Sequence, residues 1–445
     1  MRSQMYSISS LLFSSMIVML MISSSLAAFG ADAASDVSTP RPIRVRTQPT
    51  VTVGQNEGDI QGKDTRAIQA AIDYMSQLGG GVVHVLPGVY AVNNTVHLRS
   101  GVTLRGSGDN TILMKRPCKT TKLIRDTDWY EYAVQVEDPT GFEPGGGLAL
   151  SKNGDLELTF FTISAVKGNV IYLNECVDMG EKMTKRNFWV ANQSVASTSF
   201  SIIDGWSVND VKIEDIVLDG DRADNPLING NFAGAVFTQD CNRWSFKNVT
   251  ARNFNGDGFS CQVCDDFHFE ACHSLGNGGL GFHIGSGAQR PIFRSCVSNG
   301  NSQGFFWCWG ATDGLAENCT ASDNDLYGFN FGHRDRDNIV RGATVERNGK
   351  VGILFREEDE PFQAADGNRI VNCLIRDNGG KDSGFGIDIQ FTTKDINIEN
   401  CRFENTSNGK QITAIRMGKD VGRVTLKENK FTGSSKQTDD QRAVK

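Results

Sequence analysis

At 445 residues, the chain is long enough to bury a large core in one elongated domain or in two ordinary ones. A formal net charge of −7 gives no reason to expect a nucleic-acid partner. Its 48 glycines, together with frequent asparagine, suit a chain of many tight turns and argue against a fold of long helices.

The N-terminus has the pattern of a targeting segment. Arg2 precedes an apolar run at 11–22, and the small residues of SSSLAAFGADAA follow it. The run is short for a membrane span, so a signal peptide over residues 1–33 is favoured over a membrane anchor. We therefore expect a secreted or periplasmic protein, a linker over 34–50, and no stable membrane insertion after cleavage.

Residues 51–116 predict an N-terminal cap and the first coils of a repeat. Asp64 and Thr65 begin a helix that Gly79 and its neighbours end, and apolar residues recur along one side of it at Ile68, Ala71, Ile72 and Met75. The strand patterns VVHVLPGVYAV and VHLRSGVTLRGSG follow. Such a helix can cover the open end of an apolar column, which would otherwise contact water. Residues 117–200 alternate as strands without the repeat's rhythm and predict a small β-rich insertion.

A repeat of 23 to 24 residues, with one longer step of 32, dominates the rest of the chain. Each unit opens on a glycine and a large apolar residue, starting at Gly258, Gly281, Gly304, Gly328, Gly352 and Gly384. A second strand and a turn rich in Asn, Asp and Gly follow. No helical stripe separates the strands, and a propeller blade needs about twice this period. The pattern predicts an all-β, single-stranded right-handed parallel β-helix over 201–433 and a flexible tail over 434–445.

Cysteine spacing follows the same repeat. The eleven cysteines are an odd number, and five of them share one place in successive second strands, where Ala343 substitutes once: Cys272, Cys296, Cys319, Cys373 and Cys401. Coils lie ~4.8 Å apart, so these thiols should form a buried ladder whose adjacent rungs are poorly oriented for disulfides. Cys261 and Cys264 lack a second pair, so no metal site is predicted.

One stretch also resembles a known family. The run GKDTRAIQAAIDYMSQLGGGVVHVLPGVYAV, together with the coil repeats, resembles the pectate-lyase-like right-handed parallel β-helix superfamily. That superfamily includes lyases, hydrolases, epimerases and phage depolymerases, so the resemblance implies the fold and no single activity. The aspartate pairs of its polygalacturonase branch and the calcium-binding aspartates of its pectate-lyase branch are not recognisable here. No cofactor is predicted, although a divalent cation such as calcium stays possible.

Strand alternation assigns an inner and an outer face to each coil. Positions +1 and +3 after the repeat glycine should point inward, and positions +2 and +4 outward. Equal positions in successive coils should share one face, a strip on the order of 20–25 Å long over five coils. The candidate catalytic residues on this strip are His283, His333, Glu357 and Asp388. The candidate substrate-binding residues are Gln262, Arg290, Trp309, Arg334, Asp335 and Arg356.

Two chemistries fit these residues. In β-elimination of a uronate, a histidine would act as the base, with Arg356 or Arg290 as the cation, and the leading hypothesis is that His333 is the general acid and base while Arg356 holds the substrate's charge. In glycoside hydrolysis, a pair of carboxylates would flank the bond, drawn from Glu357 or Glu358 with Asp388 or Asp335. A non-catalytic carbohydrate-binding or adhesion β-helix is the third reading. Under all three interpretations we expect a polysaccharide partner. His333 falls at position +5, where alternation predicts an inward side chain, so its role requires a bend.

Overall fold

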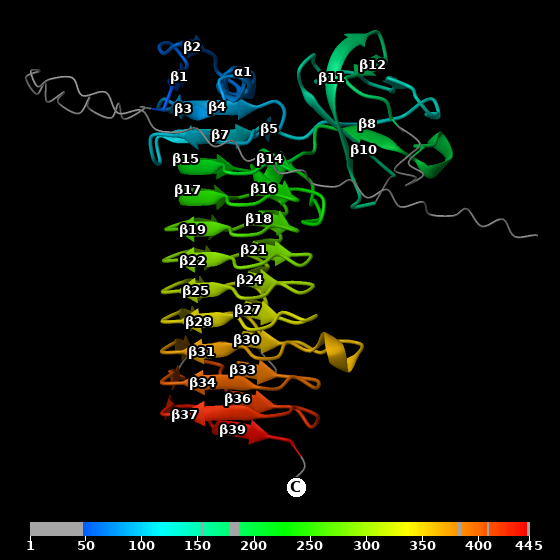
Figure 1. The fold of residues 1–445 in the computed structure, drawn as a ribbon. Helices are drawn as coiled ribbons and strands as arrows, with labels where there is room; N and C mark the ends of the chain where they lie inside the picture. Colours follow the sequence, from blue (N-terminus) through cyan, green and yellow to red (C-terminus); the bar gives the residue numbers. More distant parts are fainter. Residues whose placement is uncertain (1–47, 153–154, 178–186, 381–383, 407–408, 443–445) are drawn as a thin grey trace, which may run out of the picture. The chain divides into compact units, whose positions relative to one another are not determined.

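The computed structural model describes residues 48–152, 155–177, 187–380, 384–406 and 409–442. The expected signal peptide at 1–33, and residues 34–47 of the expected linker, lie outside these residues. The described chain forms stacked coils of parallel strands and an inserted antiparallel sheet (Figure 1). A parallel β-helix is therefore the fold, as the repeat predicts.

One long parallel sheet, called sheet 2 here, collects the strands that open each repeat. Neighbouring coils pair in register, so Phe259 lies beside Phe282, and Phe282 beside Phe305. Within the described residues its strands are β5 (Val96–His97), β14 (Ile203–Trp206), β16 (Gly234–Gln239), β18 (Asp257–Gln262), β21 (Leu280–Gly285), β24 (Gln303–Trp307), β27 (Tyr327–Phe331), β30 (Val351–Phe355), β33 (Phe385–Ile389), β36 (Thr413–Met417) and β39 (Lys436–Asp440).

The other parallel sheet, sheet 1, completes the coils. At its N-terminal end lie β1 (Thr50–Gly54), β2 (Ile60–Gln61), β3 (Gly81–Val85), β4 (Gly88–Val92), β6 (Val102–Arg105), β7 (Thr111–Lys115), β15 (Lys212–Asp219) and β17 (Ser245–Arg252). Its later coils each contribute two short strands: β19 (His268–Glu270) and β20 (His273–Leu275), β22 (Ile292–Arg294) and β23 (Val297–Asn299), β25 (Leu315–Glu317) and β26 (Thr320–Ser322), β28 (Ile339–Arg341) and β29 (Thr344–Glu346), β31 (Arg369–Val371) and β32 (Leu374–Arg376), β34 (Ile396–Glu399) and β35 (Arg402–Glu404), β37 (Val424–Lys427) and β38 (Lys430–Thr432).

The prediction of one second strand in each later repeat is thus wrong, because a corner divides that segment into two short strands. The residue before each column cysteine has a left-handed backbone, as at Ala271 (φ 50°) and Ser295 (φ 53°), and this turns the chain. The cysteines themselves form the buried column that the spacing predicts. All eleven cysteines of the chain are free.

Like residues stack on like residues inside the coils. The ring centroids of Phe259, Phe282, Phe305 and Phe329 follow one another at 4.9, 4.8 and 4.7 Å. A column of buried asparagines at the turn passes hydrogen bonds from coil to coil, with the Asn324 side-chain amide donating to Asn348 Oδ1 at 2.9 Å. Buried turn groups are satisfied in this way, which removes the cost of leaving them unpaired.

The last repeat is shifted from its sequence alignment. Ile387, and not Phe385, lies beside Ile353, so Gly386 is the equivalent of Gly352. Phe385 is only half-buried as a result. Because the shift is two residues and the side-chain period of a strand is also two, Asp388 keeps its predicted outward direction.

The N-terminal cap forms as predicted. Helix α1 (Thr65–Gln77) begins at Asp64, whose carboxylate accepts a hydrogen bond from the Arg66 backbone N–H at 3.0 Å. The four apolar residues of its predicted stripe are buried in the core that runs through the coils. Among the described residues, no helix is long and apolar enough to cross a membrane.

The insertion expected over 117–200 is an antiparallel sheet with its own apolar core, which includes Leu148, Phe161 and Ile171. In order across the sheet, its strands are β8 (Thr120–Lys122), β13 (Val195–Ser197), β10 (Gly147–Ser151), β11 (Thr159–Lys167), β12 (Val170–Leu173) and β9 (Ala133–Gln135). Short 3₁₀ turns are η1 (Val190–Asn192), η2 (Arg222–Asp224) and η3 (Pro361–Gln363). The tail expected to be flexible contains β39, which pairs with β36 and extends sheet 2.

The cysteine column predicts a specific pattern of thiol reactivity. Cys296, a member of this column, is fully buried, and burial raises the pKa of its thiol well above the usual range. A thiol-selective alkylating reagent should therefore leave the column unmodified in the folded protein and react fastest at the half-exposed Cys118. After denaturation without reductant, mass spectrometry should find eleven modified cysteines. Disulfides between neighbouring column cysteines would contradict the ladder.

Candidate functional site

The outward residues of sheet 2 share one face, as the repeat predicts. Neighbouring strands place these residues side by side in the order His283, Phe306, Asn330, Leu354, Asp388 and Arg416. None of them belongs to the apolar core inside the coils. The functional groups of this face therefore come from several repeats and meet only through the register of the strands.

Arg356, which follows β30, is the centre of one cluster on this face. Its Nε lies 2.8 Å from Glu358 Oε1, and its Nη1 donates to the Trp307 carbonyl at 3.1 Å and to Asn330 Oδ1 at 3.2 Å. The guanidinium also covers the Phe306 ring at 4.9 Å. With these contacts the Arg356 side chain is only 19% exposed. Its guanidinium therefore mainly holds its neighbours in place and is not free to bind a substrate.

A bend after β27 turns His333 toward the same cluster. The bend uses left-handed backbone at His333 (φ 26°) and Arg334 (φ 69°). The Asp335 carboxylate holds it by accepting the backbone N–H groups of Gly310, Ala311 and Gly332 at 3.0, 3.0 and 2.8 Å. Asp335 is fully buried, and burial raises its pKa to about 7. Its expected role in binding substrate is therefore wrong, because no substrate can reach this carboxylate.

His333 and Glu358 form a dyad beside an exposed aromatic ring. His333 Nδ1 lies 3.2 Å from Glu358 Oε2, and the His333 backbone N–H donates to Glu358 Oε1 at 2.6 Å. The imidazole stacks on Trp309 with the ring centroids 4.7 Å apart, and Trp309 is 59% exposed. A carboxylate on Nδ1 fixes the ring and leaves Nε2 as the atom that can exchange a proton.

A groove of about 590 Å³ lies next to this cluster over β27, β30, β33 and β36. Arg356 lines it, together with Lys350, Arg416, Glu357 and Asp388. Asp388 is 1% exposed and holds Arg416, whose Nε donates to Asp388 Oδ1 at 2.6 Å. Lysine and arginine thus outnumber acidic residues among the groove's lining.

Other predicted residues lie away from this groove. His283 is 5% exposed, and its Nδ1 lies 2.8 Å from Asp257 Oδ2 and 3.4 Å from the Gln262 amide nitrogen. Ser260, beside it on the same face, donates to the Gly230 carbonyl at 2.6 Å, so the segment before β16 covers this part of the face. His283 and Gln262 are therefore enclosed, and the structure does not group them with His333.

Arg290 and Arg334 differ in their surroundings. Arg290 lies in an exposed turn and forms ion pairs with Asp266 at 2.7 Å and Asp265 at 3.3 Å. Its charge is already paired, which makes a role in substrate binding less favourable. Arg334 is exposed beside His333 and is anchored by its backbone N–H, which donates to the Gln363 carbonyl at 2.6 Å. Only Arg334 of this pair remains a candidate for substrate binding.

Sequence reasoning missed a second histidine–carboxylate dyad. His97 Nδ1 lies 2.7 Å from Asp204 Oδ1, and Trp206 Nε1 donates to Asp204 Oδ2 at 3.1 Å. The inserted sheet separates these residues by 107 positions along the chain, and only the pairing of β5 with β14 joins them. The repeat becomes recognisable only from residue 235 onward, so no sequence signal placed His97 in phase with Asp204.

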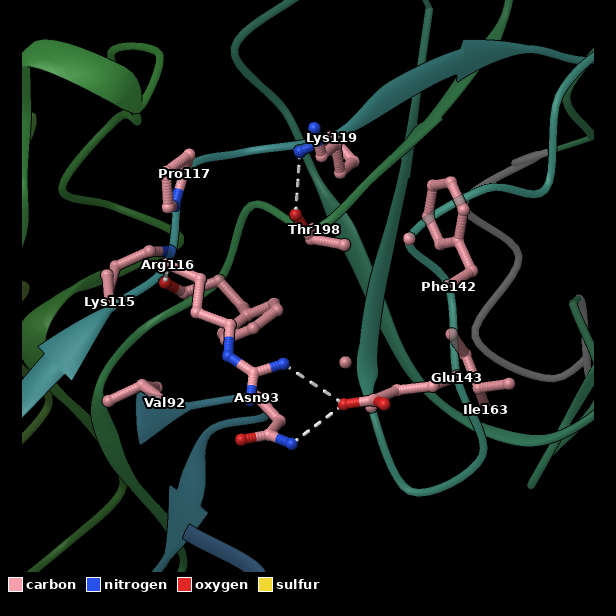
Figure 2. Close-up of a pocket in the computed structure, with 14 residues that line it drawn as sticks. Val92, Asn93, Lys115, Arg116, Pro117, Lys119, Phe142, Glu143, Ile163 and Thr198 are labelled. Atoms are coloured by element: carbon pink, nitrogen blue, oxygen red, sulfur yellow. Dashed lines mark hydrogen bonds and ion pairs between the residues drawn. The ribbon is translucent and has the colours of Figure 1, made fainter. Parts of the chain in front are cut away.

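A separate recess lies between the first coils and the inserted sheet (Figure 2). Its volume is about 270 Å³, and Glu143 accepts hydrogen bonds there from Asn93 and Arg116. Lys115 is buried at its edge, where Nζ donates to the Phe200 carbonyl at 2.7 Å and lies 4.4 Å from the Phe200 ring. In the described part of the chain, no group of three or more His, Cys, Asp or Glu is placed to hold a metal ion.

Comparisons with known proteins agree with the fold. Residues 233–364 match the family described as the right handed beta helix region, so the coils form a right-handed parallel β-helix. The A-module of the mannuronan C-5 epimerase AlgE4 from Azotobacter vinelandii is similar in structure, with a TM-score of 0.53, 14% identity, and coverage of 88% of this chain and 100% of the module. No curated protein matches the chain by sequence.

Two further structures resemble the chain to a similar extent. ORF18 of Geobacillus virus E2 has a TM-score of 0.53 and 13% identity, over 86% of this chain and 62% of that one. The surface adhesin PfbA of Streptococcus pneumoniae has a TM-score of 0.51 and 12% identity, over 85% and 90%. At these identities the similarities establish the fold alone, since one fold hosts many functions.

Lys115 should make stability depend on pH in a defined window. Burial lowers its pKa from 10.5 to about 8, a difference worth roughly 3 kcal/mol. The unfolded chain binds more protons than the folded one between these two values, so the contribution of Lys115 to stability rises with pH across the window. Chemical denaturation at pH 7 and pH 10 should show this rise in the wild type and a smaller one in Lys115→Met. Equal pH dependence in both proteins would contradict the burial of a titrating amine.

Proposed function

We propose that the groove over β27 to β36 binds an acidic, uronate-containing polysaccharide and that the His333–Glu358 dyad cleaves it by β-elimination. The observation that carries the proposal is this dyad, held beside a groove in which lysine and arginine outnumber acidic residues. The epimerase module of similar fold is named for mannuronan, and the fold is therefore compatible with such a polymer. The chain would act outside the cell, as its N-terminal pattern suggests.

Charge in the groove favours carboxylate groups on the substrate. Lys350 is exposed at the groove's wall, and no ion pair of its side chain is found among the described residues. Arg416 is held by Asp388 and by the Phe385 ring, 4.1 Å away, so its remaining N–H groups are fixed in direction. A fixed guanidinium and a free ammonium can hold successive acidic units of an extended chain.

The proposed reaction assigns one task to each residue. His333 Nε2 removes the proton from the carbon next to the uronate carboxylate, and Arg334 stabilises the negative charge that develops on that group. A carbon–carbon double bond forms as the bond to the glycosidic oxygen breaks. The protonated imidazole then gives its proton to the leaving glycosidic oxygen. Arg356, expected to hold substrate charge, instead holds Glu358, which orients the imidazole.

Hydrolysis is less well supported by the same geometry. A glycosidase needs two carboxyl groups that can reach the bond. Asp335 is fully buried, Asp388 is paired with Arg416, and Glu358 is shared by Arg356 and His333. Of the four candidate carboxylates, only Glu357 is exposed, so these four do not supply a pair of available carboxyl groups at the groove. A purely binding function would give the His333–Glu358 dyad no chemical role.

Replacing His333 should remove activity without unfolding the protein. We expect His333→Ala to lower kcat on a uronate polymer by roughly 10²–10⁴, the range for losing an acid–base group. The measurement is the ultraviolet absorbance of the unsaturated uronate product. His268→Ala, which removes an exposed histidine of sheet 1, is the matched control and should keep wild-type activity. Reducing ends without unsaturated product would favour hydrolysis, and full activity in His333→Ala would contradict the assignment.

Replacing Lys350 should weaken binding of charged substrate only. Lys350→Ala removes one exposed cation of the groove, so KM for an oligouronate should rise by roughly tenfold at low salt, and the difference from wild type should shrink as salt is added. Lys427→Ala, an exposed lysine of sheet 1, controls for net charge. An unchanged KM in Lys350→Ala, or an equal rise in both variants, would show that the groove does not bind the acidic chain.

A further inference from the structure

The cleft at the His97–Asp204 dyad is separate from the acidic-polymer groove. It measures about 190 Å³ and lies between the inserted sheet, which contributes Thr162 and Glu175, and the first strands of sheet 2, which contribute His97 and Asp204. Between the cleft and the groove, Ser260 and His283 are covered and buried. A ligand in this cleft would therefore occupy a site of its own.

Trp206 forms a fixed aromatic surface at this cleft. Its indole Nε1 donates to Asp204 Oδ2 at 3.1 Å, and its ring packs against Phe237 with the centroids 5.3 Å apart. Despite both contacts, Trp206 is 53% exposed. A large exposed ring that is already held in place loses little conformational entropy on binding, so it can stack on a flat apolar face of a ligand.

The dyad supplies a directional hydrogen-bonding group next to this ring. Asp204 fixes Nδ1 of His97, whose backbone N–H also donates to Gln69 Oε1 at 2.8 Å. The His97 side chain is 37% exposed, which leaves Nε2 as the atom to meet a ligand. Burial opposes protonation and so does Arg99, but the hydrogen bond and charge of Asp204, with Asp73 nearby, raise the pKa of His97 overall.

The charges around the cleft select against an acidic ligand. Its lining contains Asp204 and Glu175 but no lysine or arginine among the described residues, whereas the groove has Lys350, Arg356 and Arg416. Asn174 and Thr162 add uncharged polar groups, although each already hydrogen-bonds within the protein. An aromatic surface with hydroxyl-binding groups and no cation except the dyad's histidine suits a neutral sugar.

We propose that this cleft is a second carbohydrate site, which binds an uncharged sugar unit stacked on Trp206 and hydrogen-bonded to His97 Nε2. The site follows from the contacts of Trp206, His97 and Asp204 and does not depend on the β-elimination proposal. It gives the inserted sheet a function, because that sheet supplies one wall of the cleft. A polymer with both neutral and acidic units could engage both sites.

Calorimetric titration of the full chain tests the proposal with cellotetraose, mannotetraose and xylotetraose as neutral probes and tetragalacturonate as the acidic probe. At least one neutral probe should bind, and Trp206→Ala should weaken that binding by about tenfold, because a stacked ring contributes on that scale. Trp189→Ala, which removes an exposed tryptophan of the insertion, should leave it unchanged. Trp206→Phe keeps a ring and should retain most of the affinity, which covers the case that Trp206→Ala does not fold.

Nuclear magnetic resonance of the His97 imidazole provides a second measurement of binding at this cleft. Its imidazole signals, assigned by their loss in His97→Gln, should shift when the neutral probe is added and not when tetragalacturonate is added. The proposal fails if no neutral probe binds, if wild type and Trp206→Ala bind it equally, or if the His97 signals do not move. It also fails if Trp206→Ala weakens tetragalacturonate as much as the neutral probe, because the cleft would then belong to the acidic groove.

Discussion

In-register stacking of parallel coils is the constraint on which the rest of this structure depends. Strands in such a stack lie ~4.8 Å apart, so each residue sits above its counterpart in the previous coil. Flat rings meet this spacing, as the Phe282 and Phe305 centroids at 4.8 Å illustrate. Buried amides meet it as well, because Asn324 donates to Asn348 and satisfies a turn that would otherwise bury unpaired groups.

The same register builds the functional face. Outward positions of successive coils fall in one row, so residues far apart in the chain, such as Asn330 and Arg416, come to line one groove. Charges on that face are held by their neighbours, and Arg356 orders Glu358, which in turn orients His333. Such mutual support fixes the dyad before any ligand arrives, which is what acid–base chemistry needs from a scaffold.

Periodicity in the sequence was sufficient to predict the coils, the capping helix and the outward direction of Asp388, because these depend on spacing alone. It could not reveal the corner before each column cysteine or the left-handed backbone that turns His333 outward, since both depend on φ values. It also could not show that a segment covers His283 or that Asp335 is buried. His97 and Asp204 were missed because the inserted sheet interrupts the repeat between them.

The most direct test of the account is a crystal structure of His333→Ala bound to an acidic oligouronate too long to fit one subsite. The account predicts sugar density along the groove over β27 to β36, with carboxylates at Lys350 and Arg416 and one glycosidic bond next to the vacated imidazole position. Density confined to another surface, or an oligouronate that fails to bind while the protein stays folded, would contradict it.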